Sequence, residues 1–187
     1  MRSSECLILD ASCLLNLYAT GRLGEVVLTV GARIEVADYV LEHEAIYTWQ
    51  TDSTGTREEM VPVDLTPLAE EGLIRAVRLE RPDDQSTFVT LAALVDDGEA
   101  ATGALAFHRG CSVATDDRKA RRVFGEFMPD VQLVSTLEFM KIWADESRIP
   151  GDELRVAMEK MRDSASYVPS SRDPFFEWWT TVMASED

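Results

Sequence analysis

The feature that most constrains the fold is an alternation of short aliphatic runs with segments of helical periodicity. This order is typical of a parallel sheet with helices on its faces, because each parallel strand needs a long crossover before the next one. The expected strands are residues 6–10, 33–36, 74–79, 112–115 and 131–134. The expected helices are residues 12–20, 38–50, 84–95, 98–109 and 117–127. The chain is therefore predicted to have an α/β fold with a parallel sheet flanked by helices.

Several expected helix ends carry capping residues. Asp38 and Asp97 are well placed as N-caps. Ser135, with Glu138 three residues later, forms a capping box for the helix that follows. The polar segment 51–59, TDSTGTREE, is rich in turn-forming residues and predicts an exposed loop.

Length and composition bound the number of domains. A chain of 187 residues with 45% hydrophobic content can bury one good core but is short for two ordinary domains. We expect one domain over residues 1–149 and a helical C-terminal extension over residues 150–187. In the extension a helix is predicted to run to about Met161, before the motif FFEWW. Trp178 and Trp179 of that motif are expected to pack in the protein or against a partner protein, because the acidic residues beside them disfavour RNA.

The N-terminus and the cysteines bear on the compartment. No basic region followed by an apolar stretch opens the chain, and nowhere do eighteen apolar residues run together, so we expect a cytoplasmic protein without a membrane span. Cys6, Cys13 and Cys111 are odd in number and include no Cys-x-x-Cys pair. They are expected to be buried reduced thiols, with neither a disulfide framework nor a zinc site.

The overall charge of the chain argues against a nucleic-acid partner. The chain has 34 acidic and 18 basic side chains, a formal net charge of −16. Such a chain repels nucleic acid and attracts cationic partners. His43 and His108 stand alone, with no companion at metal-ligand spacing, so we expect neither a ligand nor a general base from them.

Carboxylates follow two of the predicted strands. Asp10 ends the run LILD, and Asp116 and Asp117 follow SVAT. Ligands of open parallel sheets bind beyond the carboxyl ends of the strands, where the strand order reverses. Two strands are therefore expected to deliver acids to one edge of the sheet. A helix cap is the alternative role for Asp10.

Further acids lie on predicted helices. Glu99 is expected in the first turn of a helix, where the dipole favours a carboxylate. Glu42 and Glu44 both flank the apolar face of another helix, and periodicity does not choose between them. Four converging carboxylates repel one another unless a cation neutralises them. Mg²⁺ and Mn²⁺ prefer such oxygen ligands.

Taken in order, the segments LILDASCLLNLYATGRL, IEVADYVLEHEAIY, DDGEAATGALA and SVATDDRKARRVF resemble the PIN domain, in the form found in VapC-type toxins and related PIN proteins. The resemblance covers roughly residues 6–134. It implies a PIN-like, Rossmann-like parallel sheet and a cluster of three or four acids that holds Mg²⁺ or Mn²⁺. It also implies metal-dependent RNA cleavage that leaves a 5′-phosphate.

The resemblance assigns roles to individual residues of this chain. Many family members have Asp where this chain has Glu99, and the aromatic C-terminal extension has no counterpart in the short toxins. Glu44 is preferred to Glu42 because the sequence AIY follows it. The implied catalytic metal ligands are Asp10, Glu44, Glu99 and Asp116 or Asp117, with Ser12 supporting the first acid and Thr115 preceding the fourth.

Four basic residues follow the acid pair: Arg118, Lys119, Arg121 and Arg122. They could form a phosphate-binding patch beside the metal, which an anionic nuclease would need. Salt bridges to surrounding acids are the alternative.

Two classes of function fit these features. The first is a metal-dependent endoribonuclease with RNA as substrate, for which a toxin role, an antitoxin partner and a homodimer are candidates by resemblance. The second is a non-catalytic PIN-like scaffold for protein interaction. A phosphate-accepting signalling domain fits less well, because Asp10 stands alone at its strand and no Lys ends the strand at 131–134.

Overall fold

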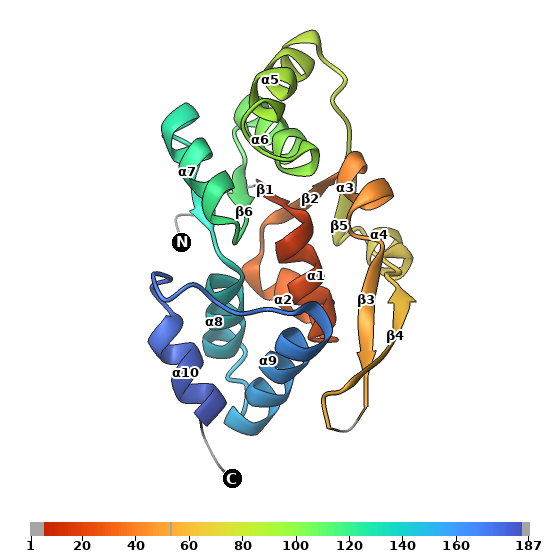
Figure 1. Ribbon diagram of the computed structural model, residues 1–187, viewed down its shortest axis with the longest axis vertical. Coiled ribbons are helices and arrows are strands. Elements are labelled where there is room, and N and C mark those ends of the chain that lie inside the picture. Colours follow the sequence, from red (N-terminus) through yellow and green to blue (C-terminus); the bar gives the residue numbers. More distant parts are fainter. Residues whose placement is uncertain (1–5, 53, 185–187) are drawn as a thin grey trace.

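The computed structural model describes residues 6–52 and 54–184, and in this part of the chain five parallel strands form one sheet in the order β5-β2-β1-β6-β7 (Figure 1). The strands are β1 (Cys6–Leu9), β2 (Arg33–Ala37), β5 (Ile74–Val77), β6 (Ser112–Ala114) and β7 (Leu133–Val134). Neighbouring strands pair in parallel throughout. The α/β fold with a helix-flanked parallel sheet is confirmed, and it is compatible with a Rossmann-like fold.

The strand order reverses at β1. The chain first builds the sheet outward through β2 and β5, and then returns to the other side of β1 with β6 and β7. Leu7, Ile8 and Leu9 of β1 are fully buried, as expected for a central strand covered on both faces. The carboxyl ends of β1 and β6 therefore lie side by side at the reversal point, where open sheets bind ligands.

Two helical layers cover the sheet in the described residues (Figure 1). One layer contains α1 (Ala11–Ala19), α2 (Leu23–Val30), α8 (Thr136–Glu146) and α9 (Gly151–Ala165). The other contains α3 (Asp38–His43), α5 (Pro82–Ala92) and α6 (Asp97–Arg109). Phe124 of α7 (Arg118–Phe127) contacts α6 at Gly103. Gly103 allows that last contact, because a Cβ there would lie 2.7 Å from the Phe124 ring.

The helix expected over residues 38–50 is wrong beyond His43. Residues Tyr47–Thr51 form β3, which pairs antiparallel with β4 (Arg57–Pro62). The alternating sequence YTWQT has the period of a strand, and pairing with β4 overrides the helical pattern before it. The loop expected at 51–59 is confined to the hairpin turn, where the Asp52 carboxylate accepts hydrogen bonds from the following backbone.

Two short helices were not expected from the sequence, α2 and α4 (Thr66–Glu70). Two N-caps also differ by one residue. Asp38 is the first residue of α3, after the N-cap Ala37, and Asp96 caps α6 in place of Asp97. Ser135 caps α8 as predicted, and its hydroxyl accepts a hydrogen bond from the Glu138 amide at 3.3 Å.

The C-terminal segment packs onto the rest of the chain. Helix α9 lies against α1 and β3, and its residues Leu154, Met158 and Met161 are buried in the common core. Trp179 of α10 (Phe176–Ala184) is buried and meets the Tyr167 ring edge-on at 5.5 Å between centroids. Packing within the protein therefore accounts for Trp179. The domain boundary near residue 149 stays a prediction.

The expectation of three reduced thiols is wrong for two of them. Cys6 and Cys111 form a disulfide, with 4.8 Å between their Cα atoms, whereas Cys13 is a free, buried thiol. The pairing of Leu7 with Ser112 places the two preceding cysteines opposite each other at the start of two adjacent parallel strands. Sequence spacing could not show this, because the two residues are 105 positions apart.

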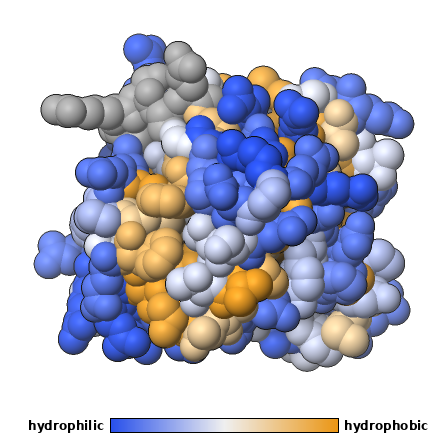
Figure 2. All heavy atoms as spheres, turned by 90° about the horizontal axis from the view of Figure 1, so that it is seen from above, coloured by the Kyte–Doolittle hydropathy of each residue, from blue (hydrophilic) through white to orange (hydrophobic). Residues whose placement is uncertain are grey.

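Most of the surface seen from above is hydrophilic, with apolar side chains gathered in one area (Figure 2). Exposed apolar residues in and around helices α5, α6 and α7 are Val89, Leu94, Phe107 and Phe127. No helix in the described residues combines the length and the hydropathy that crossing a membrane would need.

Candidate functional site

Asp10 lies at the point where β1 gives way to α1. Its amide donates to the carbonyl of Ala114 at 3.0 Å, so β6 holds it at the carboxyl edge of the sheet. The Asp10 side chain is 4% exposed and caps α1. Its Oδ2 accepts hydrogen bonds from the hydroxyls of Ser12 and Thr115, each at 3.0 Å. Asp10 thus combines the cap role with a buried position at the sheet edge.

Burial raises the pKa of Asp10, and the charge of Asp116 adds to this effect, whereas hydrogen bonds from Ser12, Thr115 and Ala11 act against it. The two hydroxyls that the resemblance marked therefore both contact Asp10 and partly stabilise its charged form.

Glu44 reaches the site from the end of α3. Its Oε1 accepts a hydrogen bond from the Gly98 amide at 3.1 Å, in the first turn of α6. A Cβ on residue 98 would lie 1.9 Å from Oε2 of Glu44, so only glycine leaves room for the carboxylate. Glu42 has a side chain that is 60% exposed and lies beside His43. The structure therefore brings Glu44, and not Glu42, to the N-terminus of α6.

Glu99 follows Gly98 on the same helix. Its Oε2 accepts a hydrogen bond from the Asp96 amide at 3.3 Å. Burial raises the pKa of Glu99 to about 7, and the charges of Asp10 and Asp117 contribute to this shift. The pKa of Glu44 is also raised, by burial and then by the charge of Asp10. Electrostatic repulsion thus couples these carboxylates, which come from four different elements.

The adjacent acids Asp116 and Asp117 point to different partners. Asp116 accepts hydrogen bonds from the Thr136 amide at 3.0 Å and from the Asn16 amide group at 3.2 Å, and the Thr136 hydroxyl also donates to it. Asp117 caps α7, and its Oδ1 accepts from the amides of Lys119 and Ala120. Asp116 is therefore tied to α1 and α8, while Asp117 is the one whose charge raises the pKa of Glu99.

Sequence reasoning missed three residues of this region: Asn16, Gly98 and Thr136. Asn16 is buried in α1, where it interrupts the apolar run LLNLY, and that interruption was the available signal. A glycine in the first turn of an expected helix was a weaker signal for Gly98. Nothing in the local sequence pointed to Thr136, because its role depends on the position of Asp116.

The basic residues of α7 divide into two groups. Arg121 donates through Nη1 to the carbonyls of Thr115 at 2.8 Å and Val134 at 3.1 Å, so it closes the ends of β6 and β7. Arg118, Lys119 and Arg122 are exposed. The Arg121 guanidinium is thus hydrogen-bonded to the sheet edge, whereas the other three side chains extend from the helix into solvent.

A groove of about 750 Å³ runs beside the acids. Its lining includes the C-terminal segment 167–174 together with Asp116, Asp117, Arg118 and Arg121. Opposite charges therefore line a groove at the carboxyl edge of the sheet. The contribution of the C-terminal segment was not foreseen from the sequence.

The described carboxylates at the carboxyl edge of the sheet do not form a group of three whose oxygens lie as close together as the ligand atoms of one bound ion. Among the described residues, the group of three potential metal ligands whose ligand atoms all lie within 4.8 Å of one another is Cys6, Glu35 and Cys111, which is elsewhere in the sheet. Within the same residues no salt bridge joins Asp10, Glu44, Glu99 or Asp117 to a basic side chain. Among the residues that the structure describes, no ion pair therefore offsets the charge of these four acids.

Comparison with protein-family models, with curated proteins and with solved structures finds no match to this chain. Any functional conclusion therefore rests on the residues of the chain and their geometry.

The raised pKa of Glu99 predicts a pH-dependent stability. Its ordinary value is 4.5 and its value in the folded protein is about 7. Between these values the folded state binds more protons than the unfolded state, so the free energy of unfolding falls as the pH rises from 4.5 to 7 and this effect levels off above 7. Thermal melts in EDTA across this range should show a shallower decline for Glu99→Gln than for wild type. An equally steep decline in both proteins would contradict the assignment.

Proposed function

We propose that the protein is a metal-dependent endoribonuclease of PIN type, which hydrolyses RNA phosphodiesters with a Mg²⁺ or Mn²⁺ ion held by carboxylates. One observation carries the proposal: Asp10, Glu44, Glu99 and Asp117 lie around the reversal point of a parallel sheet, and burial, together with repulsion from neighbouring acids, raises the pKa of the first three. Groups with perturbed pKa values at such a position are typical of functional sites.

The donor set fits the proposed metal in its chemistry. It consists of carboxylates, which Mg²⁺ and Mn²⁺ prefer, and a cation would relieve the repulsion that adds to burial in raising their pKa values. Asp10, Glu44 and Glu99 would hold the ion, with Asp117 as the fourth acid. When bound, such an ion activates water and stabilises negative charge on a phosphodiester oxygen.

Neighbouring residues would orient these ligands. Ser12 and Thr115 fix the Asp10 carboxylate through their hydroxyls, and the Gly98 amide fixes Glu44. Arg118, at the edge of the groove, would bind a phosphate of the substrate. A local basic side chain is needed because the net charge of −16 repels RNA elsewhere.

The test is cleavage of a mixed RNA substrate by the purified protein in Mn²⁺, with EDTA as control. We expect cleavage in Mn²⁺ and none in EDTA. Thermal melts without RNA should also shift upward, because a ligand at 100 times its Kd stabilises the folded state by about 2.7 kcal/mol. Absence of both cleavage and stabilisation would contradict the proposal.

A non-catalytic PIN-like scaffold is the second candidate. The hydrogen bonds that occupy Asp116 favour it, as does the spacing of the edge carboxylates, no three of which lie within 4.8 Å in the described residues. If Mn²⁺ stabilises the protein but RNA is not cleaved, we would conclude that the metal site is real and that it does not catalyse RNA hydrolysis. No response to Mn²⁺ at millimolar concentration would favour the scaffold.

A toxin role within a toxin–antitoxin pair extends the nuclease proposal. The acidic chain suits a basic antitoxin segment, and complementary charge speeds and selects such association. Growth arrest on expression that Asp10→Asn relieves would support this role. A second copy of the chain is a further candidate partner, which light scattering of the purified protein would reveal.

A further inference from the structure

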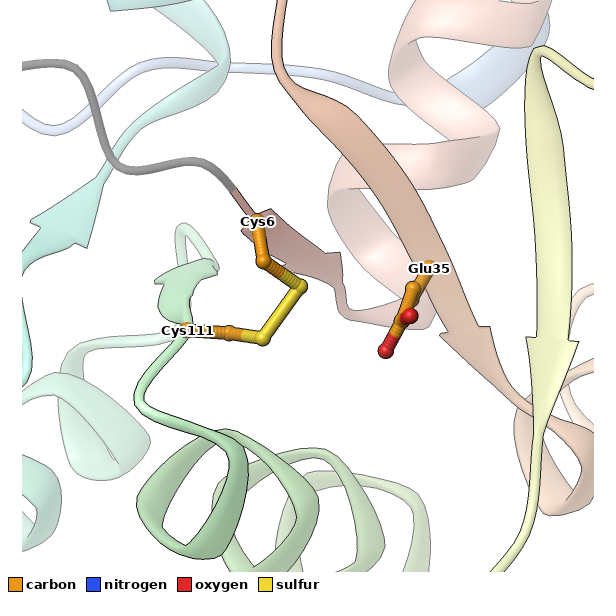
Figure 3. Close-up of side chains that lie close together, drawn as sticks. All are labelled: Cys6, Glu35 and Cys111. Atoms are coloured by element: carbon orange, nitrogen blue, oxygen red, sulfur yellow. A yellow bond between two sulfur atoms is a disulfide. The ribbon is translucent and has the colours of Figure 1, made fainter.

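A second cluster of chemically reactive groups lies at the other ends of the same strands. Cys6 begins β1 and Cys111 directly precedes β6, whereas Asp10 and Asp116 follow these strands. Glu35 of β2 is 1% exposed and points toward the two sulfur atoms (Figure 3). One ligand atom from each of the three side chains lies within 4.8 Å of the other two.

The register of the sheet produces this cluster. Ile8 pairs with Glu35, and side chains alternate along a strand, so the side chains of Glu35 and Cys6 lie on the same face. Helix α6 covers this face and ends in Arg109. The cluster is therefore enclosed between the sheet and the last turn of α6.

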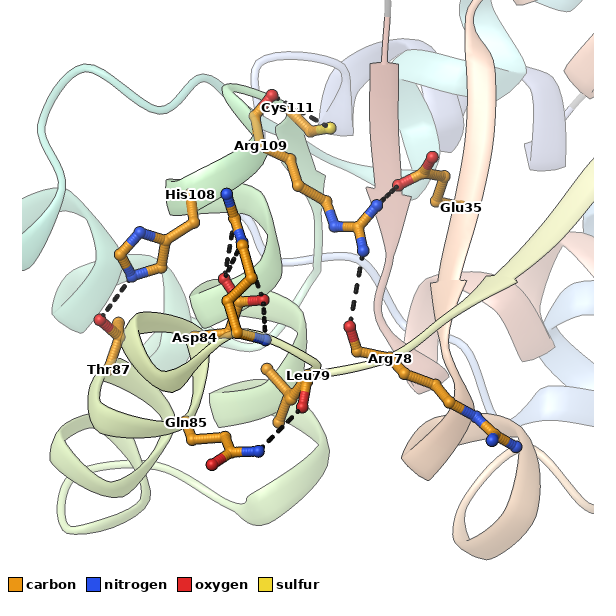
Figure 4. A network of polar contacts seen from close by, with 10 residues as sticks. Glu35, Arg78, Leu79, Asp84, Gln85, Thr87, His108, Arg109 and Cys111 are labelled. Atoms are coloured by element: carbon orange, nitrogen blue, oxygen red, sulfur yellow. Dashed lines mark hydrogen bonds and ion pairs between the residues drawn. The ribbon is translucent and has the colours of Figure 1, made fainter.

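Two arginines balance the charge of Glu35. Arg33 Nε lies 3.0 Å from one carboxylate oxygen. Arg109 Nη1 lies 3.5 Å from the other, a contact that Figure 4 shows. Arg109 also donates to the carbonyl of Arg78 at 3.5 Å, which holds the guanidinium in place. Glu35 is thus held by two ion pairs in a buried position.

A buried carboxylate gains nothing from a disulfide, because a disulfide has no proton to donate. Two thiols differ in this respect, since they can donate hydrogen bonds, or release their protons and bind a metal ion as thiolates. Reduction would therefore add two possible partners to the arginines that already contact Glu35. Two thiolates and a carboxylate are a set that Zn²⁺ accepts, with Zn–S distances of about 2.3 Å.

We propose that reduction of this disulfide opens a zinc site whose ligands are the Cys6 and Cys111 thiolates and the Glu35 carboxylate. A dithiol supplies two electrons and two protons, becomes a disulfide itself and leaves two thiols on the protein. Binding of Zn²⁺ then releases both thiol protons. The resulting complex has one net negative charge, which Arg33 and Arg109 offset.

Both the reductant and the ion need a route to the sulfur atoms. A cavity of about 450 Å³ borders Cys111, between the end of α6 and the loop that precedes β7. Gly110 and residues 128–132 line this cavity. Water from the cavity can fill the fourth position that Zn²⁺ requires in a tetrahedral site.

The experiment compares oxidised and reduced wild-type protein, with the redox state verified by mass. The phosphine used for reduction is removed without air, and Co²⁺ is titrated as a spectroscopic substitute for Zn²⁺. We expect the reduced protein to develop a thiolate-to-cobalt absorption band, which Zn²⁺ then abolishes. The oxidised protein should show no band. This readout does not depend on RNA cleavage or on the proposed nuclease function.

Matched variants separate this site from other metal binding. Glu35→Gln should weaken Zn²⁺ binding at least about tenfold, an effect that even outer-shell partners of metals have. Cys13→Ser should leave the band unchanged, as should Asp10→Asn. The double variant Cys6→Ser/Cys111→Ser should lose it.

Three results would overturn the proposal. They are a reduced protein without the band, an equal band in the oxidised protein, and a band that persists in the double serine variant. If the double variant does not fold, the comparison of the two wild-type redox states decides. If the reduced protein unfolds, Zn²⁺ must restore its native circular dichroism spectrum, and failure to do so also rejects the site.

Discussion

Asp10→Asn is expected to abolish metal-dependent RNA cleavage while the fold stays intact. Loss of a ligand removes several kcal/mol of charge stabilisation in the transition state, which corresponds to a decrease in rate of roughly 10³-fold. Stability should not fall in the absence of metal, because burial already disfavours the charged form of Asp10. The neutral side chain keeps an oxygen that can accept from the Ser12 or Thr115 hydroxyl. Cleavage rate, Mn²⁺ affinity and melting temperature should be measured on the same preparation.

Asp130→Asn is the matched control for this variant. It makes the same chemical change at an exposed position in the loop before β7, away from the four edge acids. It should cleave RNA at the wild-type rate. Cleavage by Asp10→Asn at the wild-type rate would reject the nuclease site. A loss of cleavage that accompanies a loss of the native circular dichroism spectrum would be a folding effect, and Glu44→Gln would then test the site.

Gly98→Ala is expected to remove Glu44 from the site without removing its side chain. The added Cβ would lie 1.9 Å from Oε2 of Glu44 and 2.3 Å from its carboxyl carbon, so the carboxylate must move away. The structural cost is small, because the end of a flexible side chain moves and alanine favours the helix by up to about 1 kcal/mol over glycine. We expect Mn²⁺ affinity to fall about 10- to 100-fold, as when the partners that orient metal ligands are lost. Isothermal titration with Mn²⁺ measures this effect.

Gly125→Ala provides the corresponding control. Gly125 is a helical glycine of α7, and a Cβ there would meet no atom within 4 Å. This variant should bind Mn²⁺ like wild type and melt at the same or a slightly higher temperature. Equal affinities for Gly98→Ala and wild type would show that Glu44 does not hold the ion, and would return attention to Glu42.

Much of the fold was predictable because it depends on local patterns. The five strands and most helices follow from runs such as LIL and from helical periodicity, and these patterns reflect burial on both faces of a sheet. The exception is the segment that follows His43. Residues 38–43 are helical as predicted, but Tyr47–Thr51 pair with Arg57–Pro62, and strand pairing depends on a partner that periodicity does not identify.

The position of Asp10 could be predicted for the same local reason, because an acid that follows a central strand must lie at the sheet edge. The choice between Glu42 and Glu44 could not be predicted from the sequence. It depends on the contact of Glu44 with Gly98, which lies 54 positions away. Asp116 and Asp117 likewise could not be told apart from the sequence. In the structure Asp116 contacts Thr136 and Asn16, whereas Asp117 caps α7.

The sequence by itself determined the α/β class, the parallel strands and the edge at which the acids gather, because these follow from periodicity and from the direction of the strands. Only the tertiary structure decided which acids face one another, which arginine closes the sheet edge and that Cys6 meets Cys111 beside Glu35. The physical reason is the register between elements far apart in the chain. Register is set by packing of the whole core, and a shift of one residue in the pairing of β1 with β2 would turn Cys6 and Glu35 to opposite faces of the sheet.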